Sequence, residues 1–304
     1  MPIRLAVHVG PHKTGSTSVQ RALVAHRERL AEAGVWYPPS LERAEFPDQH
    51  ADIAGLLIKG GVDQVVAWLM TARSEAAQRG CDTLFLSSEN FRAPMIRRRL
   101  VGALRRFRRQ AGAETRLLYV CRSHQALARS QVMARLDGEL GFFFRERYDL
   151  RSWAADFRHQ QRREEQFFAR HRARFLQLEA TPPASLASEL LRLATDRDHG
   201  FVETGRANVT AARLAGPPAA MQAYGLRVMQ KIIGGAPIVG TTAARVVSAA
   251  ATPDDATYPR LLTEFEAAVA AAIAAGFADA DGESVWQYRW RLAGRHLAEI
   301  RRLW

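Results

Sequence analysis

Cysteine is almost absent from this sequence, because Cys81 and Cys121 are the only two in 304 residues. Two cysteines are too few for a disulfide framework or a cysteine zinc cluster. Long apolar runs are missing as well, since the longest, the alanine-rich stretch 267–277, falls well short of the ~20 residues that a membrane-spanning helix needs. The opening residues MPIRLAVHVG hold an apolar stretch too short for a signal peptide. We therefore expect a cytoplasmic protein with no integral membrane segment.

Lysine is scarce too: Lys13, Lys59 and Lys231 are the only lysines among 43 basic residues, and the rest are arginines. Against 31 acidic residues they give a net charge of +12. Such a charge suits nucleic acid, a membrane surface or a phosphate-rich ligand, and it also follows from arginine-rich codon usage. The arginines are scattered, without interleaved aromatic residues or a known nucleic-acid-binding motif. We therefore expect no nucleic acid among the partners. A nucleic-acid-binding module is kept as an alternative function.

Apolar runs and amphipathic stretches alternate along the first part of the chain, and 47% of all residues are hydrophobic, enough for an ordinary globular core. Residues 3–9 (IRLAVHV) are typical of a strand buried on both faces. The pattern predicts further strands at 83–88, 115–121 and 173–178, and helices at 16–33, 64–79, 94–111, 123–137, 151–171 and 184–195. Strands alternating with helices predict an α/β fold with a parallel sheet covered by helices on both faces.

The composition changes beyond residue 199. Residues 200–255 are rich in Gly, Ala, Thr and Pro with weak periodicity, and two helices are predicted after them, at 257–275 and 285–302. We expect a single domain, 1–304, in which an α/β core (1–199) carries a mostly helical C-terminal elaboration (200–304).

The most informative stretch is HVGPHKTGSTSVQRAL, residues 8–23, which follows the first predicted strand and opens the first predicted helix. In that position backbone N–H groups and the positive end of a helix dipole can surround an anion. Lys13 adds a positive charge. Hydroxyl donors come from Thr14, Ser16, Thr17 and Ser18. The stretch predicts a phosphate-binding loop, flanked by His8 packed at the strand end and His12 in solvent.

A nucleoside-triphosphatase loop reads G-x4-G-K-[ST], with lysine directly after the second glycine. Gly10 and Gly15 have this separation, but Ser16 stands where the lysine belongs, and Lys13 lies two residues before Gly15. A P-loop kinase that uses Mg²⁺-ATP is therefore an alternative, but the loop lacks the lysine that such a kinase needs after the second glycine. The sequence has no His, Asp or Glu cluster with metal-ligand spacing, so we expect no metal.

Two further segments follow predicted strands. Residues 117–130 (LLYVCRSHQALARS) place Arg122 just after a strand and Ser130 about two turns into the next helix. An arginine fork and a hydroxyl suit a terminal phosphate monoester. Residues 84–91 (LFLSSENF) place Glu89 just after the strand before it. Ligands bind at the carboxyl ends of strands in such sheets, so these residues are candidates for one site.

Together these motifs resemble those of sulfotransferases that use 3′-phosphoadenylyl sulfate (PAPS), especially bacterial and carbohydrate sulfotransferases, over about residues 3–195. The loop of that family reads close to KTGTTS, and here it reads Lys-Thr-Gly-Ser-Thr-Ser. The resemblance implies a P-loop NTPase-like fold in which Lys13 contacts the bridging oxygen of PAPS. It implies that Arg122 and Ser130 hold the 3′-phosphate. The residues that it assigns to the 5′-phosphate and sulfonate are Thr14, Gly15, Ser16, Thr17 and Ser18.

The resemblance also implies a general base. Glu89 matches a Ser-Ser-Glu segment in which a glutamate takes that role, and His50 resembles a histidine that is the alternative base or a substrate contact. Arg206 and Asn208 resemble a late segment that closes over the nucleotide, although the Arg-Lys-Gly of cytosolic sulfotransferases is missing. The implied product is adenosine 3′,5′-bisphosphate, and the acceptor a hydroxyl of a carbohydrate, glycolipid or small alcohol. The sequence leaves the acceptor and the oligomeric state open.

Overall fold

The computed structural model describes residues 3–12, 14–40, 50–136, 150–181, 186–199, 245, 257–284, 286–291 and 293–294. The chain divides into two compact units: the first holds Met1–Ser123 and Glu164–Val209, and the second holds His124–Arg163 and Thr210–Trp304. Lys13, Arg206 and nearly all of the region 200–255 lie outside the described residues. The predicted boundary at residue 199 therefore stays a prediction.

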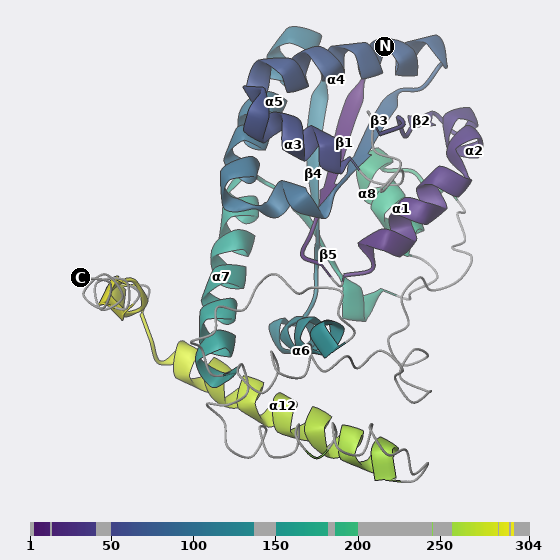
Figure 1. Cartoon of the computed structure of the whole chain (residues 1–304). Coiled ribbons are helices and arrows are strands. Elements are labelled where there is room, and N and C mark those ends of the chain that lie inside the picture. Colours follow the sequence, from purple (N-terminus) through teal and green to yellow (C-terminus); the bar gives the residue numbers. More distant parts are fainter. Residues whose placement is uncertain are drawn as a thin grey trace. The chain divides into compact units, whose positions relative to one another are not determined.

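A five-stranded sheet runs through the first unit (Figure 1). Its order is β2-β3-β1-β4-β5, and every neighbouring pair is parallel. The strands are β1 (Arg4–Val9), β2 (Val35–Trp36), β3 (Thr83–Ser87), β4 (Glu114–Cys121) and β5 (Arg174–Gln177). The predicted α/β class with a parallel sheet is confirmed. The sequence predicts four of these strands and misses β2, because two residues are too few to show the hydrophobic periodicity of a strand.

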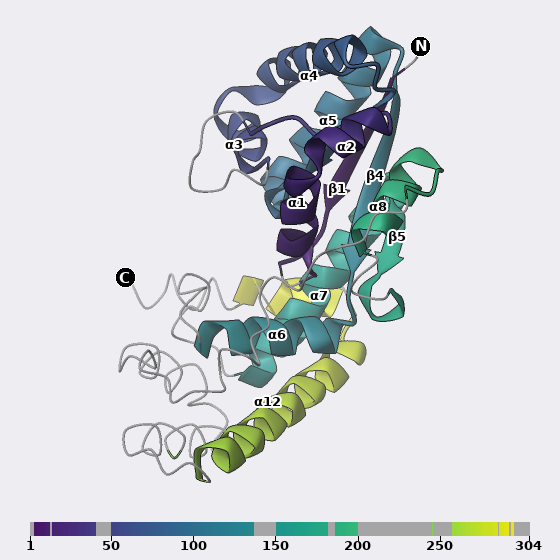
Figure 2. The same ribbon diagram turned by 90° about the vertical axis from the view of Figure 1, so that its right-hand side faces the viewer.

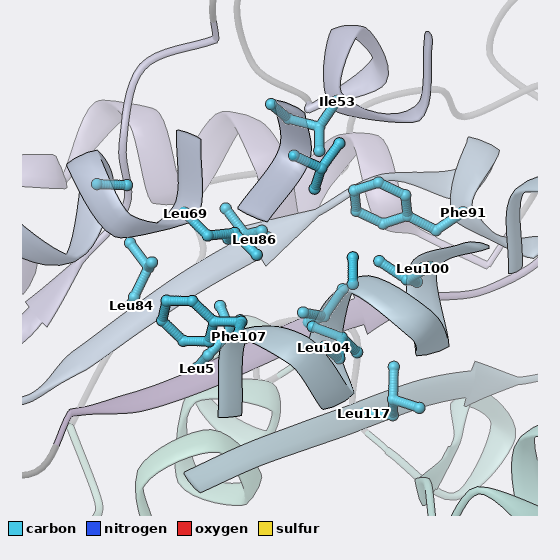
Figure 3. Packing of buried hydrophobic residues seen from close by; sticks show 14 of the residues in the cluster. Leu5, Ile53, Leu69, Leu84, Leu86, Phe91, Leu100, Leu104, Phe107 and Leu117 are labelled. Atoms are coloured by element: carbon cyan, nitrogen blue, oxygen red, sulfur yellow. The ribbon is translucent and has the colours of Figure 1, made fainter. Parts of the chain in front are cut away.

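Helices cover both faces of this sheet (Figure 2). One face carries α3 (Ala51–Lys59), α4 (Gly61–Gln78) and α5 (Pro94–Ala111), and the other carries α1 (Ser16–Ala25), α2 (Arg27–Glu32) and α8 (Leu186–Thr195). Side chains alternate between the faces, so that Leu5 and Val7 of β1 join the first layer and Ala6 the second. Figure 3 shows Leu5 and Leu84 of the sheet beside Phe107 of α5. Two apolar layers therefore hold the sheet in place.

The helix predictions differ from the structure most clearly in three places. The helix predicted over 257–275 continues to Asp281. The helix predicted over 16–33 breaks at His26, whose φ of −115° and ψ of 24° are not helical, and continues as α2. The helix α3 is not predicted at all. By contrast, α5 matches at both ends, because Pro94 opens it and Gly112 follows it in the left-handed conformation. Prediction succeeds where the chain carries explicit start and stop residues.

The second unit is helical in its described residues. It contains α6 (His124–Leu136), residues 150–163 of α7 (Leu150–Arg170), α12 (Thr257–Asp281) and the helical residues 286–291 and 293–294. Helices α6 and α12 pack against each other. Arginines of this unit pair with the acids of α12: Arg129 with Glu266 at 2.7 Å, and Arg162 with Asp281 at 2.6 Å. Part of the arginine excess is thus structural. Among the described residues, no helix is both long enough and apolar enough to cross a bilayer.

Candidate functional site

Three of the predicted motifs meet at one edge of the sheet. Strand β1 pairs in parallel with β3 on one side and β4 on the other, so all three strands end at the same edge. The loop from Gly10 to Gly15 follows β1, Glu89 follows β3, and Arg122 follows β4. After β1 the chain continues to β2, on one side of β1 in the sheet. After β3 it crosses β1 to reach β4, on the other side. The carboxyl ends of β1 and β3 therefore lie at the topological switch point of the sheet. Open α/β sheets bind their ligands at such a point.

The loop after β1 brings polar groups to the start of α1. Thr14 Oγ1 donates to the carbonyl of Pro11 at 2.7 Å and lies 3.3 Å from Ser16 Oγ, and both side chains are buried. Gly15 is the N-cap of α1, so it has no side chain to accept from the N–H groups of the first turn. Thr17 and Ser18 are half-buried in that turn. These first-turn N–H groups and hydroxyls suit an anion. Lys13 is not among the described residues.

Gly15 is required by its conformation and by its surroundings. Its φ is +81°, and a Cβ there would lie 2.8 Å from Leu186 Cδ2 of α8. We expect Gly15→Ala to lower the free energy of unfolding by about 2–3 kcal/mol, because backbone strain and overpacking add up. Gly112→Ala is the matched control, since its φ is +61° with nothing within 4 Å, and about 1 kcal/mol is expected there. Equal losses in denaturant unfolding would contradict the proposed packing of the loop on α8.

Glu89 lies next to the loop through a contact that sequence reasoning missed. Glu89 opens the short 3-10 helix η1 (Glu89–Arg92) after β3, and the preceding Ser88 caps it by accepting from the N–H of Asn90 at 3.2 Å. The Glu89 side chain is largely buried, and its Oε2 pairs with Nδ1 of His12. His12 thus pairs with an acidic side chain, whereas the sequence predicts that His12 is surrounded by solvent. The pair joins the loop after β1 to the end of β3.

A buried carboxylate anchors the other end of η1. Glu164 accepts from Arg92 Nη1 at 2.9 Å and from Tyr119 Oη of β4 at 2.9 Å. Burial raises the pKa of Glu164, against the effect of the two donors. The turn that carries Glu89 is therefore tied to β4 and to the last part of α7. Nothing in the sequence marks Glu164, which lies in a run of charged helical residues.

His50 comes to the same end of β3 but is fully engaged there. Its Nδ1 accepts from the N–H of Ser87 at 3.1 Å, and its Nε2 donates to the carbonyl of Pro38 at 3.1 Å. The His50 N–H also donates to the carbonyl of Ser87 at 2.9 Å, and the side chain is buried. Because both ring nitrogens have partners, the geometry favours Glu89 over His50 as a proton acceptor.

His8 lies buried at the end of β1, in the packing position that its sequence suggests. Its Nδ1 is 2.8 Å from Ser87 Oγ, which also accepts from Gln20 Nε2 of α1 at 3.0 Å. The Ser87 hydroxyl has two acceptor lone pairs and one hydrogen, so it accepts from Gln20 and either donates to His8 Nδ1 or accepts from it, according to the tautomer of His8. These three side chains connect β1, β3 and α1.

The two fully buried histidines of the first unit, His8 and His50, make stability depend on pH. Burial lowers the pKa of His8 and of His50 to about 4, from 6.5 in the unfolded chain. As the pH falls below 6.5 the unfolded chain takes up protons that the folded protein does not, so folding weakens until the pH passes the folded pKa. Between about pH 7.5 and pH 5.5 we expect each histidine to cost roughly 1.4 kcal/mol, or about 3 kcal/mol together.

Denaturant unfolding at the two pH values measures this effect. His8→Gln and His50→Gln are each expected to reduce the pH dependence by roughly 1.4 kcal/mol, whatever they do to stability at neutral pH. His159, His171 and His199, whose pKa values burial also lowers, leave a remainder in both variants. Carboxyl groups whose pKa burial does not raise titrate mainly below this range and add little. Glu164, whose pKa is raised by burial, opposes the histidine effect equally in the wild type and in both variants. A pH dependence that is unchanged in both variants would contradict the assignment.

The residues predicted to hold a 3′-phosphate are placed only in part. Arg122 lies at the end of β4, where its Nε is 3.5 Å from Glu179 Oε1. The N–H of Ser123 donates to the same oxygen at 3.0 Å, so Glu179 is a carboxylate at this edge that sequence reasoning missed. Ser130 lies on α6, which belongs to the second unit. Arg206 lies outside the described residues. Their joint role stays a prediction.

The described edge of the sheet combines backbone and hydroxyl donors with one arginine and one histidine–glutamate pair. Among the residues that the structure describes, no three His, Cys, Asp or Glu side chains are grouped to hold a metal ion. Comparison with known proteins adds no family: no family model, no curated protein and no solved structure matches this chain.

Proposed function

We propose that the protein is a sulfotransferase that moves the sulfonate group of PAPS to an acceptor hydroxyl. The observation that carries the proposal is the contact of His12 with Glu89, which puts a carboxylate next to the loop that starts α1. A transferase of this kind needs an anion-binding loop and a proton acceptor side by side. The order of the motifs and their place at the ends of β1, β3 and β4 support the same interpretation.

In the proposed reaction the acceptor oxygen attacks sulfur in line with the bridging oxygen to the 5′-phosphate. Glu89 takes the proton of the acceptor hydroxyl, the sulfur–oxygen bond to the phosphate breaks, and adenosine 3′,5′-bisphosphate leaves with the negative charge. Lys13, the N–H groups of the first turn of α1 and the hydroxyls of Thr17 and Ser18 stabilise the charge that develops on the bridging oxygen. The burial of Glu89 beside His12 keeps the carboxylate in a defined place.

The 3′-phosphate distinguishes PAPS from ATP. Arg122 at the end of β4 is the proposed partner of this group, with Ser130 and Arg206 as further candidates. A guanidinium binds a phosphate monoester with two parallel hydrogen bonds, which supplies binding energy and orientation. In the bound state this phosphate competes with Glu179 for Arg122.

The proposal is tested by following the formation of adenosine 3′,5′-bisphosphate from PAPS in the presence of a metal chelator. The acceptor panel covers monosaccharides, polysaccharides, glycolipids, small alcohols and phenols, and amines serve as a contrasting class. We expect turnover with at least one hydroxyl acceptor and a sulfated product of the matching mass. Phosphorylation of an acceptor from Mg²⁺-ATP, with no use of PAPS, would instead establish the kinase alternative.

A further inference from the structure

The two members of the His12–Glu89 pair differ in their access to solvent. Nδ1 of His12 contacts Oε2 of Glu89, and the His12 side chain is 37% exposed whereas that of Glu89 is 13% exposed. A carboxylate only accepts hydrogen bonds, so the hydrogen between these two atoms belongs to the imidazole. His12 is therefore a donor that reaches from the loop after β1 to a carboxylate that lies mostly out of water.

The loop fixes the backbone around His12. Gly10 packs closely on β4, since a Cβ there would lie 3.0 Å from the carbonyl oxygen of Val120. Pro11, directly before His12, has a restricted φ, and its carbonyl accepts from Thr14 Oγ1 at 2.7 Å. The imidazole is therefore presented from a well-defined piece of backbone on both sides.

The backbone of Glu89 is also fixed, but its carboxyl group is held from the outside. The N–H of Ser88 donates to the carbonyl of His8 at 3.2 Å, which ties the start of η1 to the end of β1. Three rotatable bonds still separate the Glu89 backbone from its carboxyl group. Within the described part of the chain, the side chain that pairs with this group is that of His12. Without the imidazole the carboxyl group would be free to turn away from the loop.

We propose that His12 is a positioning residue for the general base, with Nδ1 holding Oε2 of Glu89 so that Oε1 is presented to the acceptor hydroxyl. This inference rests on the proposed sulfonate transfer and adds the group that orients its base. The proton moves from the acceptor hydroxyl to Oε1, and the imidazole neither gains nor loses a proton. A fixed orientation of the reacting group lowers the entropic part of the barrier.

His12→Ala separates this role from nucleotide binding. We expect kcat to fall about 10–100-fold, the range for a misplaced reacting group, while KM for PAPS stays within about threefold of the wild type. A partly exposed pair adds little to stability, so Tm should fall by no more than about 2–4 °C. His26→Ala is the matched control, because it removes an imidazole at the other end of α1 and should leave kcat unchanged.

Two amide variants test which ring nitrogen matters. Asparagine carries its amide nitrogen on Cγ, as histidine carries Nδ1, so His12→Asn keeps a donor for Glu89. Glutamine carries its amide nitrogen one bond farther from the backbone, close to the position of Nε2. We expect His12→Asn to regain most of the rate lost in His12→Ala and His12→Gln to regain little. The opposite order would overturn the proposal, because His12 would then contact the substrate itself through Nε2.

A double-mutant cycle completes the test. If His12 acts only through Glu89, adding His12→Ala to the Glu89→Gln protein should lower kcat by no more than about twofold. A further 10–100-fold loss in that background would overturn the proposal, since the two residues would then act independently. So would a His12→Ala protein with the wild-type kcat. A wild type that does not turn over PAPS would instead contradict the proposed function itself, which separates that failure from a failure of His12.

Discussion

Replacing Lys13 with alanine is expected to lower the rate of sulfonate transfer by about 10²–10³-fold, the usual cost of losing one donor that stabilises transition-state charge. The reason is that Lys13 carries the one fixed positive charge of the loop between β1 and α1. In the proposed reaction the bridging oxygen becomes negative at this loop. The rate is measured as formation of adenosine 3′,5′-bisphosphate with the best acceptor of the panel. Thermal unfolding should stay close to that of the wild type.

Lys59→Ala is the matched control, since Lys59 is an exposed lysine at the end of α3 and its loss removes the same charge. Its rate should equal that of the wild type. Lys13→Arg keeps a cation in the loop but replaces a compact ammonium with a planar fork, so we expect it to regain only part of the rate. A Lys13→Ala protein with the wild-type rate would remove Lys13 from the mechanism.

Glu89→Gln is expected to lower the same rate by about 10²–10⁴-fold, the range for loss of a general base. Glutamine has the shape of glutamate but cannot take the acceptor proton. Nucleotide binding should be little changed, because the loop, Arg122 and the anchor of η1 on Glu164 are retained. Measuring binding and rate on the same preparation separates the chemical step from folding.

Glu28→Gln provides the matched loss of a carboxylate at an exposed position of α2 and should leave the rate unchanged. His50→Gln tests the competing assignment. We expect its rate, corrected for the folded fraction, to stay within a few-fold of the wild type, because both ring nitrogens of His50 already bond to Ser87 and Pro38. A full rate in Glu89→Gln with a lost rate in His50→Gln would transfer the role of base to His50.

Much of the fold of the first unit is readable from the sequence. Strands β1, β3 and β4 are apolar runs, and Pro94 and Gly112 mark the two ends of α5. The parallel sheet follows from the alternation of strands and helices. The parallel order also explains why motifs that lie far apart in the chain, at Gly15, Glu89 and Arg122, come to one edge.

The contacts within that edge are not readable in the same way. The partner of Glu89 is His12, and the group that holds η1 is Glu164, which lies 75 positions after Glu89 in the chain. Such pairs depend on side-chain direction and on which helix covers which strand, and neither leaves a period or a spacing in the sequence. His50 shows the converse: its position suggested a base, but its two hydrogen bonds are visible only once Pro38 and Ser87 are in place.

The proposed site binds a nucleotide with a 3′-phosphate and needs no metal, and thermal unfolding with added nucleotide tests this proposal. With chelator present, adenosine 3′,5′-bisphosphate at 100 times its Kd should stabilise the protein by about 2.7 kcal/mol and raise Tm by several degrees. Adenosine 5′-monophosphate, which lacks the 3′-phosphate, and Mg²⁺-ATP should change Tm far less. A rise in Tm with Mg²⁺-ATP and none with adenosine 3′,5′-bisphosphate would contradict the proposed sulfotransferase function.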